Sequence, residues 1–323
     1  MADAPLTTTV AEERRRRPGL GYALVLGAIG LWSVNAAVAK VVIEAGGLSP
    51  LRLAEVRATG SAVLLFGAVL LLRPRSLRVS RREAAFLAVF GIGGLAFVHF
   101  FYFAAISRLQ IGIALVIQYL APVLVALWAR FFVHEPVRRR LWIALALCLG
   151  GLSLVVELWG GGGLDGAGVA ASLAAAFAYA LYILMADHRL RRGRDAYSLL
   201  AWGFVFAALF WAAAQPWWDF PARIVTANVS LLGRLDALAA PVWALLAYIV
   251  VFGTIVPFVL MVSALHYVPP ARATIVAMAE PVLAGLVAYA WLREDIGPQQ
   301  IGGGILVLAG IVLAQSARAR VAG

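Results

Sequence analysis

The sequence contains few of the side chains that catalysis and metal binding require. Of its 323 residues only 13% are charged, 4 are histidine and one, Cys148, is cysteine. A single cysteine excludes an intramolecular disulfide. The histidines are scattered and form no HExxH motif, and the glycine run from Gly160 to Gly163 lacks the lysine of a phosphate-binding P-loop. The sequence therefore predicts no catalytic residues, no metal and no cofactor, and we expect no enzyme.

Apolar side chains dominate instead. They make up 63% of the chain, and the mean hydropathy is +0.91. A bilayer core needs about 20 mainly apolar residues per helical span, so the chain has room for roughly ten spans. The predicted spans are Leu20 to Ile43, Leu51 to Leu72, Ala84 to Ile106, Ile111 to Phe132, Leu141 to Leu158, Gly168 to Ala186, Tyr197 to Ala214, Pro241 to Leu265, Ala271 to Trp291 and Ile301 to Gln315.

This pattern predicts an all-α integral membrane protein with five spans on each side of a glycine-rich connector. The predicted parts are an N-terminal tail (1–19), a first five-helix repeat (20–158), the connector (159–167), a second five-helix repeat (168–315) and a C-terminal tail (316–323). Arg14 to Arg17 precede the first span without a small-residue cleavage site shortly after it, which indicates a retained helix. The longest loop, Gln215 to Ala240, is rich in tryptophan and suits an aromatic belt or a short interfacial helix on the outer face.

The net charge of +11 does not indicate nucleic-acid binding, because the arginines gather in short loops between apolar runs. Ten spans place most of these loops on the side of the N-terminus. The positive-inside rule then puts both termini in the cytoplasm, and we expect a multi-pass protein of a bacterial inner membrane.

The two halves are similar to each other. Sliding the second half over the first aligns the stretch from Leu120 to Leu124 with that from Ala279 to Leu283. At the same offset Glu135 falls on Glu294 and Gly151 on Gly310. Because each half has an odd number of helices, the copies must be inverted, as in many secondary transporters.

At these residues the sequence resembles the EamA-type, ten-helix branch of the drug/metabolite transporter superfamily. The likeness covers Gly21 to Gln315 and is carried by Leu31 to Asn35, Ala114 to Glu135, Ala279 to Leu283, Leu292 to Glu294 and Gly302 to Gly310. The resemblance implies a central cavity between the halves and movement of small metabolites, often outward. Among its members the bacterial, YddG-like amino-acid exporters are the preferred analogy.

The fourth and ninth helices are the strongest candidates for the transport site. Paired proline-interrupted segments at matching positions of inverted repeats mark such sites. In the fourth helix Gln118 and Tyr119 precede Pro122, and in the ninth Met278 and Glu280 precede Pro281. Glu280 can receive a substrate ammonium group. Its alternative role is a structural bond across the repeat interface.

Polar and aromatic residues in other spans are further candidates, because such groups are costly inside a membrane. Each also has a plain packing alternative. His99 is in addition the natural proton acceptor, should a proton drive transport. These candidates are Trp32 and Asn35 in the first helix, His99 and Tyr102 in the third, Tyr179 and Tyr182 in the sixth, and Tyr248 and Thr254 in the eighth.

Three ionisable residues near span ends have expected structural roles. Lys40, the only lysine, lies near the outer end of the first helix, where it can snorkel to the interface. Glu55 and Arg57 lie near the outer end of the second helix and are too close in sequence to share a face. Interfacial anchoring, or pairing with a neighbouring helix, is the expected role of both.

The sequence thus predicts a carrier that exports amino acids by alternating access between the two repeats. Its expected partners are a small metabolite, the lipid bilayer and protons, with no nucleic acid. The alternatives are a drug or nucleotide-sugar transporter of the same superfamily and, in another class, a non-transporting receptor or assembly protein.

Overall fold

The structure is a computed structural model that describes residues 17–109, 111–134, 139–156 and 165–316. The predicted connector lies mostly outside the described residues, as do Glu135 and nearly all of both tails. The first half contains α2 (Pro18–Glu44), α3 (Pro50–Leu72), the span α4–η2–α5 (Arg81–Ala88, Val89–Ala96, Phe97–Ile106), the span α6–α7 (Ile111–Gln118, Ala121–Phe131) and α8 (Arg139–Val155).

The second half repeats this order of spans. It contains α9 (Gly166–Arg191), α10 (Ala196–Ala214), the span α11–η6–α12 (Val242–Val250, Val251–Ile255, Val256–Ala264), the span α13–α14–η7 (Pro270–Ala277, Glu280–Val287, Ala288–Leu292) and α15 (Pro298–Ser316). Nine of these ten helical spans are long and apolar enough to cross a membrane, and the tenth, α8, has 17 residues. The predicted fold class is confirmed.

Most predicted boundaries fall within three residues of the observed ones. The third span begins at Arg81 rather than Ala84, because the Ser80 hydroxyl caps it by accepting from the amide of Glu83. The sixth continues to Arg191, beyond the predicted end at Ala186, and has basic side chains in its last turn. Cations at a helix C-terminus interact favourably with the helix dipole.

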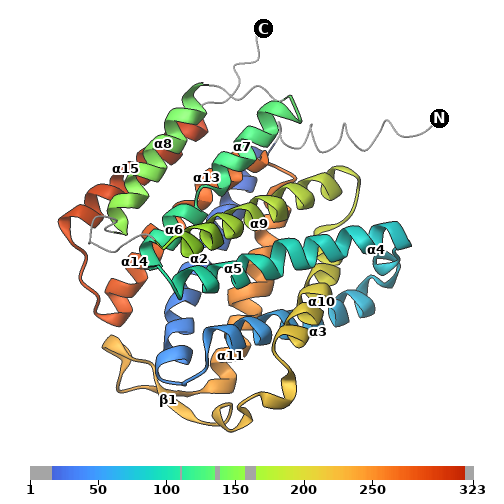
Figure 1. Ribbon diagram of the computed structural model, residues 1–323, viewed down its shortest axis with the longest axis vertical. Coiled ribbons are helices and arrows are strands. Elements are labelled where there is room, and N and C mark those ends of the chain that lie inside the picture. Colours follow the sequence, from blue (N-terminus) through green and yellow to red (C-terminus); the bar gives the residue numbers. More distant parts are fainter. Residues whose placement is uncertain (1–16, 110, 135–138, 157–164, 317–323) are drawn as a thin grey trace.

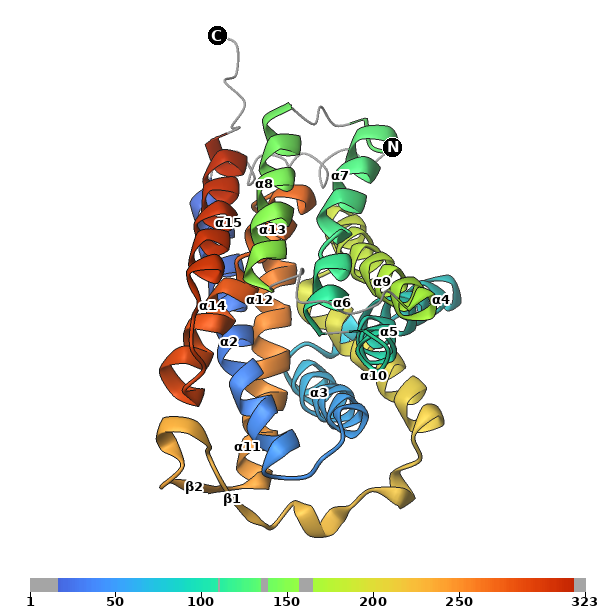
Figure 2. The same cartoon turned by 60° about the vertical axis from the view of Figure 1, so that its left-hand side comes forward.

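The long loop before α11 has a structure that the sequence did not predict. It contains short 3₁₀ turns at Trp217–Asp219 (η3), Ala222–Ile224 (η4) and Gly233–Leu235 (η5), and a two-stranded antiparallel hairpin of β1 (Asn228–Ser230) and β2 (Ala239–Pro241). Strands of three residues are too short to show an alternating pattern. The hairpin lies at one end of the bundle (Figure 2), here termed the hairpin end, and α2 begins and α15 finishes at the other, the terminal end.

The structure contains the inverted repeat in the predicted register. The fourth span is interrupted at Tyr119–Leu120 and the ninth at Met278–Ala279, which are 159 positions apart. The π-helical segments η2 and η6 also overlap at this offset. Two segments of similar sequence therefore break their helices at the same places.

The helices α8 and α15 lie side by side (Figure 2), and their contacts follow the two-fold relation. A Cβ atom on Gly151 would meet the Gly303 carbonyl oxygen at 2.5 Å, and one on Gly310 would meet the Ala144 carbonyl oxygen at 2.8 Å. These two contacts exchange under the offset of 159 positions. The Cys148 thiol contacts the Val307 carbonyl oxygen at 3.5 Å, and these positions correspond to each other, so this contact lies on the pseudo-two-fold axis.

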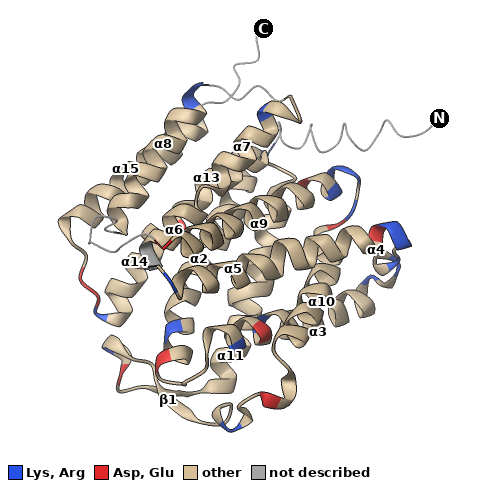
Figure 3. Ribbon diagram, in the orientation of Figure 1, with Lys and Arg blue, Asp and Glu red and all other residues tan. Residues whose placement is uncertain are grey.

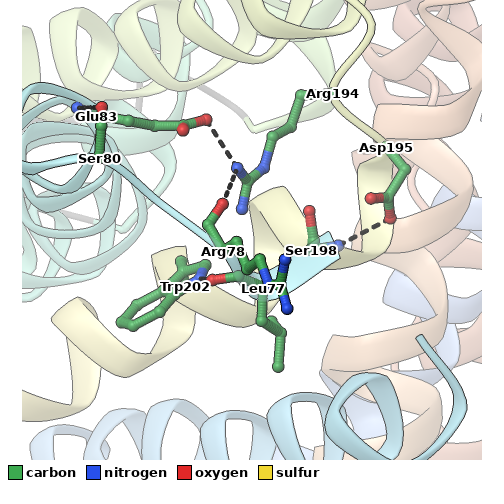
Figure 4. A network of polar contacts seen from close by, with 8 residues as sticks. All are labelled: Leu77, Arg78, Ser80, Glu83, Arg194, Asp195, Ser198 and Trp202. Atoms are coloured by element: carbon green, nitrogen blue, oxygen red, sulfur yellow. Dashed lines mark hydrogen bonds and ion pairs between the residues drawn. The ribbon is translucent and has the colours of Figure 1, made fainter. Parts of the chain in front are cut away.

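Many charged side chains lie at the ends of the spans or in the connections between them. Figure 3 shows groups of basic residues along the upper and right-hand margins of the view, at the ends of α4, α7, α8 and α9, and single basic residues elsewhere. Figure 4 shows one connection at close range: the Arg194 guanidinium donates to Glu83 Oε1 at 2.6 Å, and the Trp202 indole donates to the Leu77 carbonyl at 3.1 Å. The first bond ties the loop between α9 and α10 to α4, and the second ties α10 to the loop between α3 and α4.

The glycine contact between α8 and α15 generates a prediction. The variant Gly303→Leu is expected to lower the thermal midpoint in detergent, because its side chain meets backbone atoms of Gly151 and Val155 within 2.7 Å. Overpacking of this kind costs about 1–3 kcal/mol. The matched control is Gly302→Leu, because a Cβ at Gly302 has nothing within 4 Å. Equal midpoints for the two variants would contradict the contact.

Candidate functional site

The two interrupted helices meet at Tyr119 and Glu280. The Tyr119 hydroxyl donates a hydrogen bond to Glu280 Oε2 at 3.3 Å. Glu280 is the first residue of α14, where the positive end of the helix dipole favours a carboxylate. Pro122 and Pro281 are the second residues of α7 and α14, where a missing amide proton costs nothing. Each proline thus begins a new helix inside its span.

Four further helices bring polar groups to Glu280. The Ser33 hydroxyl of α2 donates to the Glu280 backbone carbonyl at 3.2 Å. Tyr102 of α5 and Tyr179 of α9 lie within electrostatic range of the Glu280 carboxylate. The Arg57 guanidinium of α3 also lies within electrostatic range of this carboxylate. One carboxylate, one guanidinium and three phenols therefore gather between the two halves.

Arg57 is held by the π-helical segment of the eighth span. Its Nε donates to Thr254 Oγ1 at 2.9 Å, and its Nη2 donates to the Gly253 carbonyl at 3.2 Å. The Thr254 hydroxyl in turn donates to the Ile249 carbonyl, five residues earlier, at 2.9 Å. A π-helical turn disrupts the regular backbone ladder and leaves carbonyls free to accept other donors. The fold thus supplies the acceptors that a guanidinium inside a membrane protein requires.

A small cavity adjoins this arginine. Its volume is ≈ 20 Å³, and Arg57, His99, Thr254, Trp211 and Phe258 are among the residues that line it. That volume is enough for about one water molecule. The His99 ring lies 3.1 Å from the Leu95 carbonyl through Nδ1 and is within electrostatic range of Arg57. The structure thus places His99 beside the arginine rather than beside Glu280.

Asn35 and Trp32 of α2 pack against the same eighth span. The Asn35 side chain occupies the space that a Cβ on Gly253 would need, which explains the glycine at this position. Asn35 Oδ1 is buried and has no hydrogen-bond partner among the described residues. The Trp32 ring packs edge-on to Phe258 with centroids 5.3 Å apart. Both candidates therefore lie next to the segment that holds Arg57.

The other predicted candidates occupy different surroundings. Tyr182 is buried and packs against Tyr179 and Phe258, with ring centroids 5.9 and 5.6 Å away. Met278 is fully buried in the turn between α13 and α14. Gln118 Oε1 is buried and has no partner among the described residues. Tyr248 packs against Phe252 in the apolar cluster near the hairpin.

Arg57 lies in the site but is not among the candidate binding residues that the sequence indicated. Of its two expected roles, the structure shows pairing with a neighbouring helix. The signal was present, since an ionisable group inside a span is a functional candidate by default. Glu55 instead pairs with Arg52 on its own helix at 2.7 Å, and the Lys40 ammonium contacts Glu294 at 2.5 Å near the hairpin end. No group of three or more potential metal ligands occurs in the described part of the chain.

Two threonines allow a matched test of the Arg57 anchor. Thr254→Val removes the acceptor of Arg57 Nε and the donor to Ile249, so a loss of about 1–3 kcal/mol is expected. Thr59→Val is the control, because Thr59 Oγ1 is buried without a partner among the described residues, and its removal is expected to be neutral or stabilising. Thermal midpoints in detergent measure both. A midpoint for Thr254→Val at or above that of Thr59→Val would refute the anchor.

Comparison with known proteins agrees with this architecture. A model of the EamA-like transporter family matches the chain twice, over residues 19–157 and 166–315. The chain is 28% identical to an uncharacterized transporter of Archaeoglobus fulgidus over 225 residues, which cover 68% of this chain and 74% of that protein. It is 24% identical to the uncharacterized transporter YdfC of Bacillus subtilis over 289 residues, or 88% of this chain and 87% of that protein.

A solved crystal structure shares the fold. Its chain superposes with a TM-score of 0.75 at 20% sequence identity, and the match covers 92% of this chain and 96% of that one. At this identity the likeness concerns the fold alone. The two family matches span the described helices of both halves, and the chain belongs to the EamA-like transporter family, as a membrane transporter of the drug/metabolite superfamily.

Proposed function

We propose that this protein is a secondary transporter that exports amino acids by alternating access. The observation that carries the proposal is the meeting of two interrupted helices from inverted halves at a polar pair, Tyr119 and Glu280. Inverted-repeat transporters bind their cargo at such breaks near the midplane. The cargo's ammonium group is expected to bind the Glu280 carboxylate, and Tyr102, Tyr119 and Tyr179 offer amphipathic rings that tolerate varied side chains.

The proposed orientation follows from the arginines. The connections α3–α4, α7–α8 and α9–α10 are arginine-rich, and each lies after an even number of spans, on the side where α2 begins. The positive-inside rule makes this terminal end cytoplasmic in a bacterial inner membrane, with both chain termini on that side. The hairpin end then faces outward. The function requires no catalysed reaction.

The proposal also covers the driving force and the alternative cargo. A proton gradient is a candidate driving force, with His99 as the acceptor, and a drug or nucleotide sugar is the alternative cargo. Against a nucleotide sugar, the described polar groups include one acid beside one guanidinium, which suits a small molecule with both charges rather than a diphosphate.

The function is tested with purified protein in liposomes loaded with unlabelled amino acids. Labelled amino acids are expected to enter by exchange, above the level of empty liposomes. Net uptake into liposomes without internal amino acid is the second readout: because a zwitterion carries no net charge, an imposed potassium diffusion potential is expected to leave its rate unchanged. A cargo with one net charge instead gains or loses about 2.3 kcal/mol per 100 mV. Absence of exchange by correctly folded protein would refute amino acids as cargo.

Alternating access requires the hairpin end to open. The Lys40 ammonium contacts Glu294 at 2.5 Å there and joins α2 to the residues after η7. In a Cys148→Ala background, a cleavable thiol cross-link between Lys40→Cys and Glu294→Cys is expected to stop exchange, and cleavage to restore it. The matched control joins Lys40→Cys to Glu44→Cys within α2, where the native side chains lie 3.8 Å apart. Undiminished exchange in the cross-linked interhelical pair would exclude opening at this point.

A further inference from the structure

We infer that Arg57 binds the carboxylate of the cargo and so makes the site selective for zwitterions over amines and over simple acids. The inference rests on the proposed transport function and names a recognition residue that the sequence did not reveal. It depends on three features of the structure: the donors that Arg57 keeps free, the open acceptor on Glu280, and the separation of the two charges.

Arg57 has donors to spare. A guanidinium carries five N–H groups in a planar fork. The described bonds use one on Nε and one on Nη2, and no acceptor among the described residues binds Nη1. The two bonds to Thr254 and Gly253 fix the plane of the fork, and a fixed fork suits a carboxylate. The anchor therefore orients Arg57 without saturating it.

Glu280 has a matching open acceptor. Its Oε2 accepts from Tyr119, while Oε1 has no partner among the described residues. The side chain is half-buried rather than sealed in the core. An ammonium group can therefore donate to Oε1 without displacing the tyrosine. Glu280 is the first residue of α14, and the positive end of the helix dipole stabilises its carboxylate there.

The two opposite charges influence each other but do not form an ion pair. Arg57 and Glu280 interact electrostatically, yet among the described residues no nitrogen–oxygen contact within 4 Å joins them. A charged group in a low-dielectric interior is strongly stabilised by a direct partner of opposite charge. An α-amino acid carries both complementary charges, and in a conformation that widens the ≈ 20 Å³ cavity beside Arg57 it can bridge the two groups and pair each charge. An amine or a simple carboxylic acid satisfies one group and leaves the other unpaired.

A purely structural role for Arg57 predicts something different. If the guanidinium only tied α3 to the π-helical segment of the eighth span, its removal would weaken the protein and slow all cargoes alike. Recognition of a carboxylate instead changes the ratio between cargoes. The ratio is therefore the informative measurement, and the rate alone is not.

The test uses competition in the liposome exchange assay. The competitors of the best labelled amino acid are that amino acid, the amine left by removing its carboxylate, and the acid left by removing its amino group. In the unaltered protein both analogues are expected to compete about ten-fold or more weakly, since a buried charge is left unpaired. In Arg57→Gln the amine is expected to compete as well as the amino acid, and in Glu280→Gln the acid is expected to do so.

Two further variants control the result. Arg57→Lys keeps a positive charge and is expected to keep discrimination against the amine. Arg108→Gln removes an exposed arginine near Asp165 and is expected to leave both ratios unchanged. Unchanged discrimination against the amine in folded Arg57→Gln overturns the inference while transport stands. Equal competition by all three compounds in the unaltered protein overturns it without any variant, and absence of amino-acid exchange overturns the proposed function as well.

Discussion

The constraint on which this structure depends is that lipid offers no hydrogen bonds to the backbone. Every amide and carbonyl at membrane depth must find a partner in the protein, so the chain crosses as helices. An interruption is tolerated only where other segments or side chains satisfy the freed groups. The breaks at Tyr119–Leu120 and Met278–Ala279 follow this rule, because both lie between the halves and each is followed by a proline-started helix. The polar pair Tyr119 and Glu280 thus lies where the helical backbone is interrupted.

The two halves share a fold but differ in the polar side chains at matching positions. Under the two-fold relation Tyr119 corresponds to Met278 and Glu280 to Ala121. The hydrogen bond between Tyr119 and Glu280 therefore has an apolar counterpart, and the symmetric scaffold carries an asymmetric polar site. Symmetry is retained where it governs packing, as in the glycine contacts of α8 and α15, and is lost where side chains face the space between the halves.

The π-helical segment of the eighth span connects the symmetric scaffold to the asymmetric polar site. It makes the Gly253 carbonyl and the Thr254 hydroxyl available, and these two groups hold the Arg57 guanidinium near an acid on the ninth span. Gly253 itself must lack a side chain because Asn35 fills that space. Backbone irregularity, a close helix contact and a charged side chain are thus parts of one arrangement. A regular helix at Val251–Ile255 would satisfy the Gly253 carbonyl itself and remove one of the two acceptors of the arginine.

The sequence by itself determined that this is a membrane protein, where its spans lie and that its two halves are inverted copies. Hydropathy and internal similarity are properties that can be read directly from the order of residues. The sequence also located the helix breaks, since proline acts on its own backbone. Only the tertiary structure decided which polar groups meet. Arg57 and Glu280 lie more than 200 positions apart, and whether an arginine near a helix end faces lipid headgroups or a partner depends on the helix packed beside it. The hairpin after α10 was invisible for a related reason: its short strands exist through the pairing that folding provides.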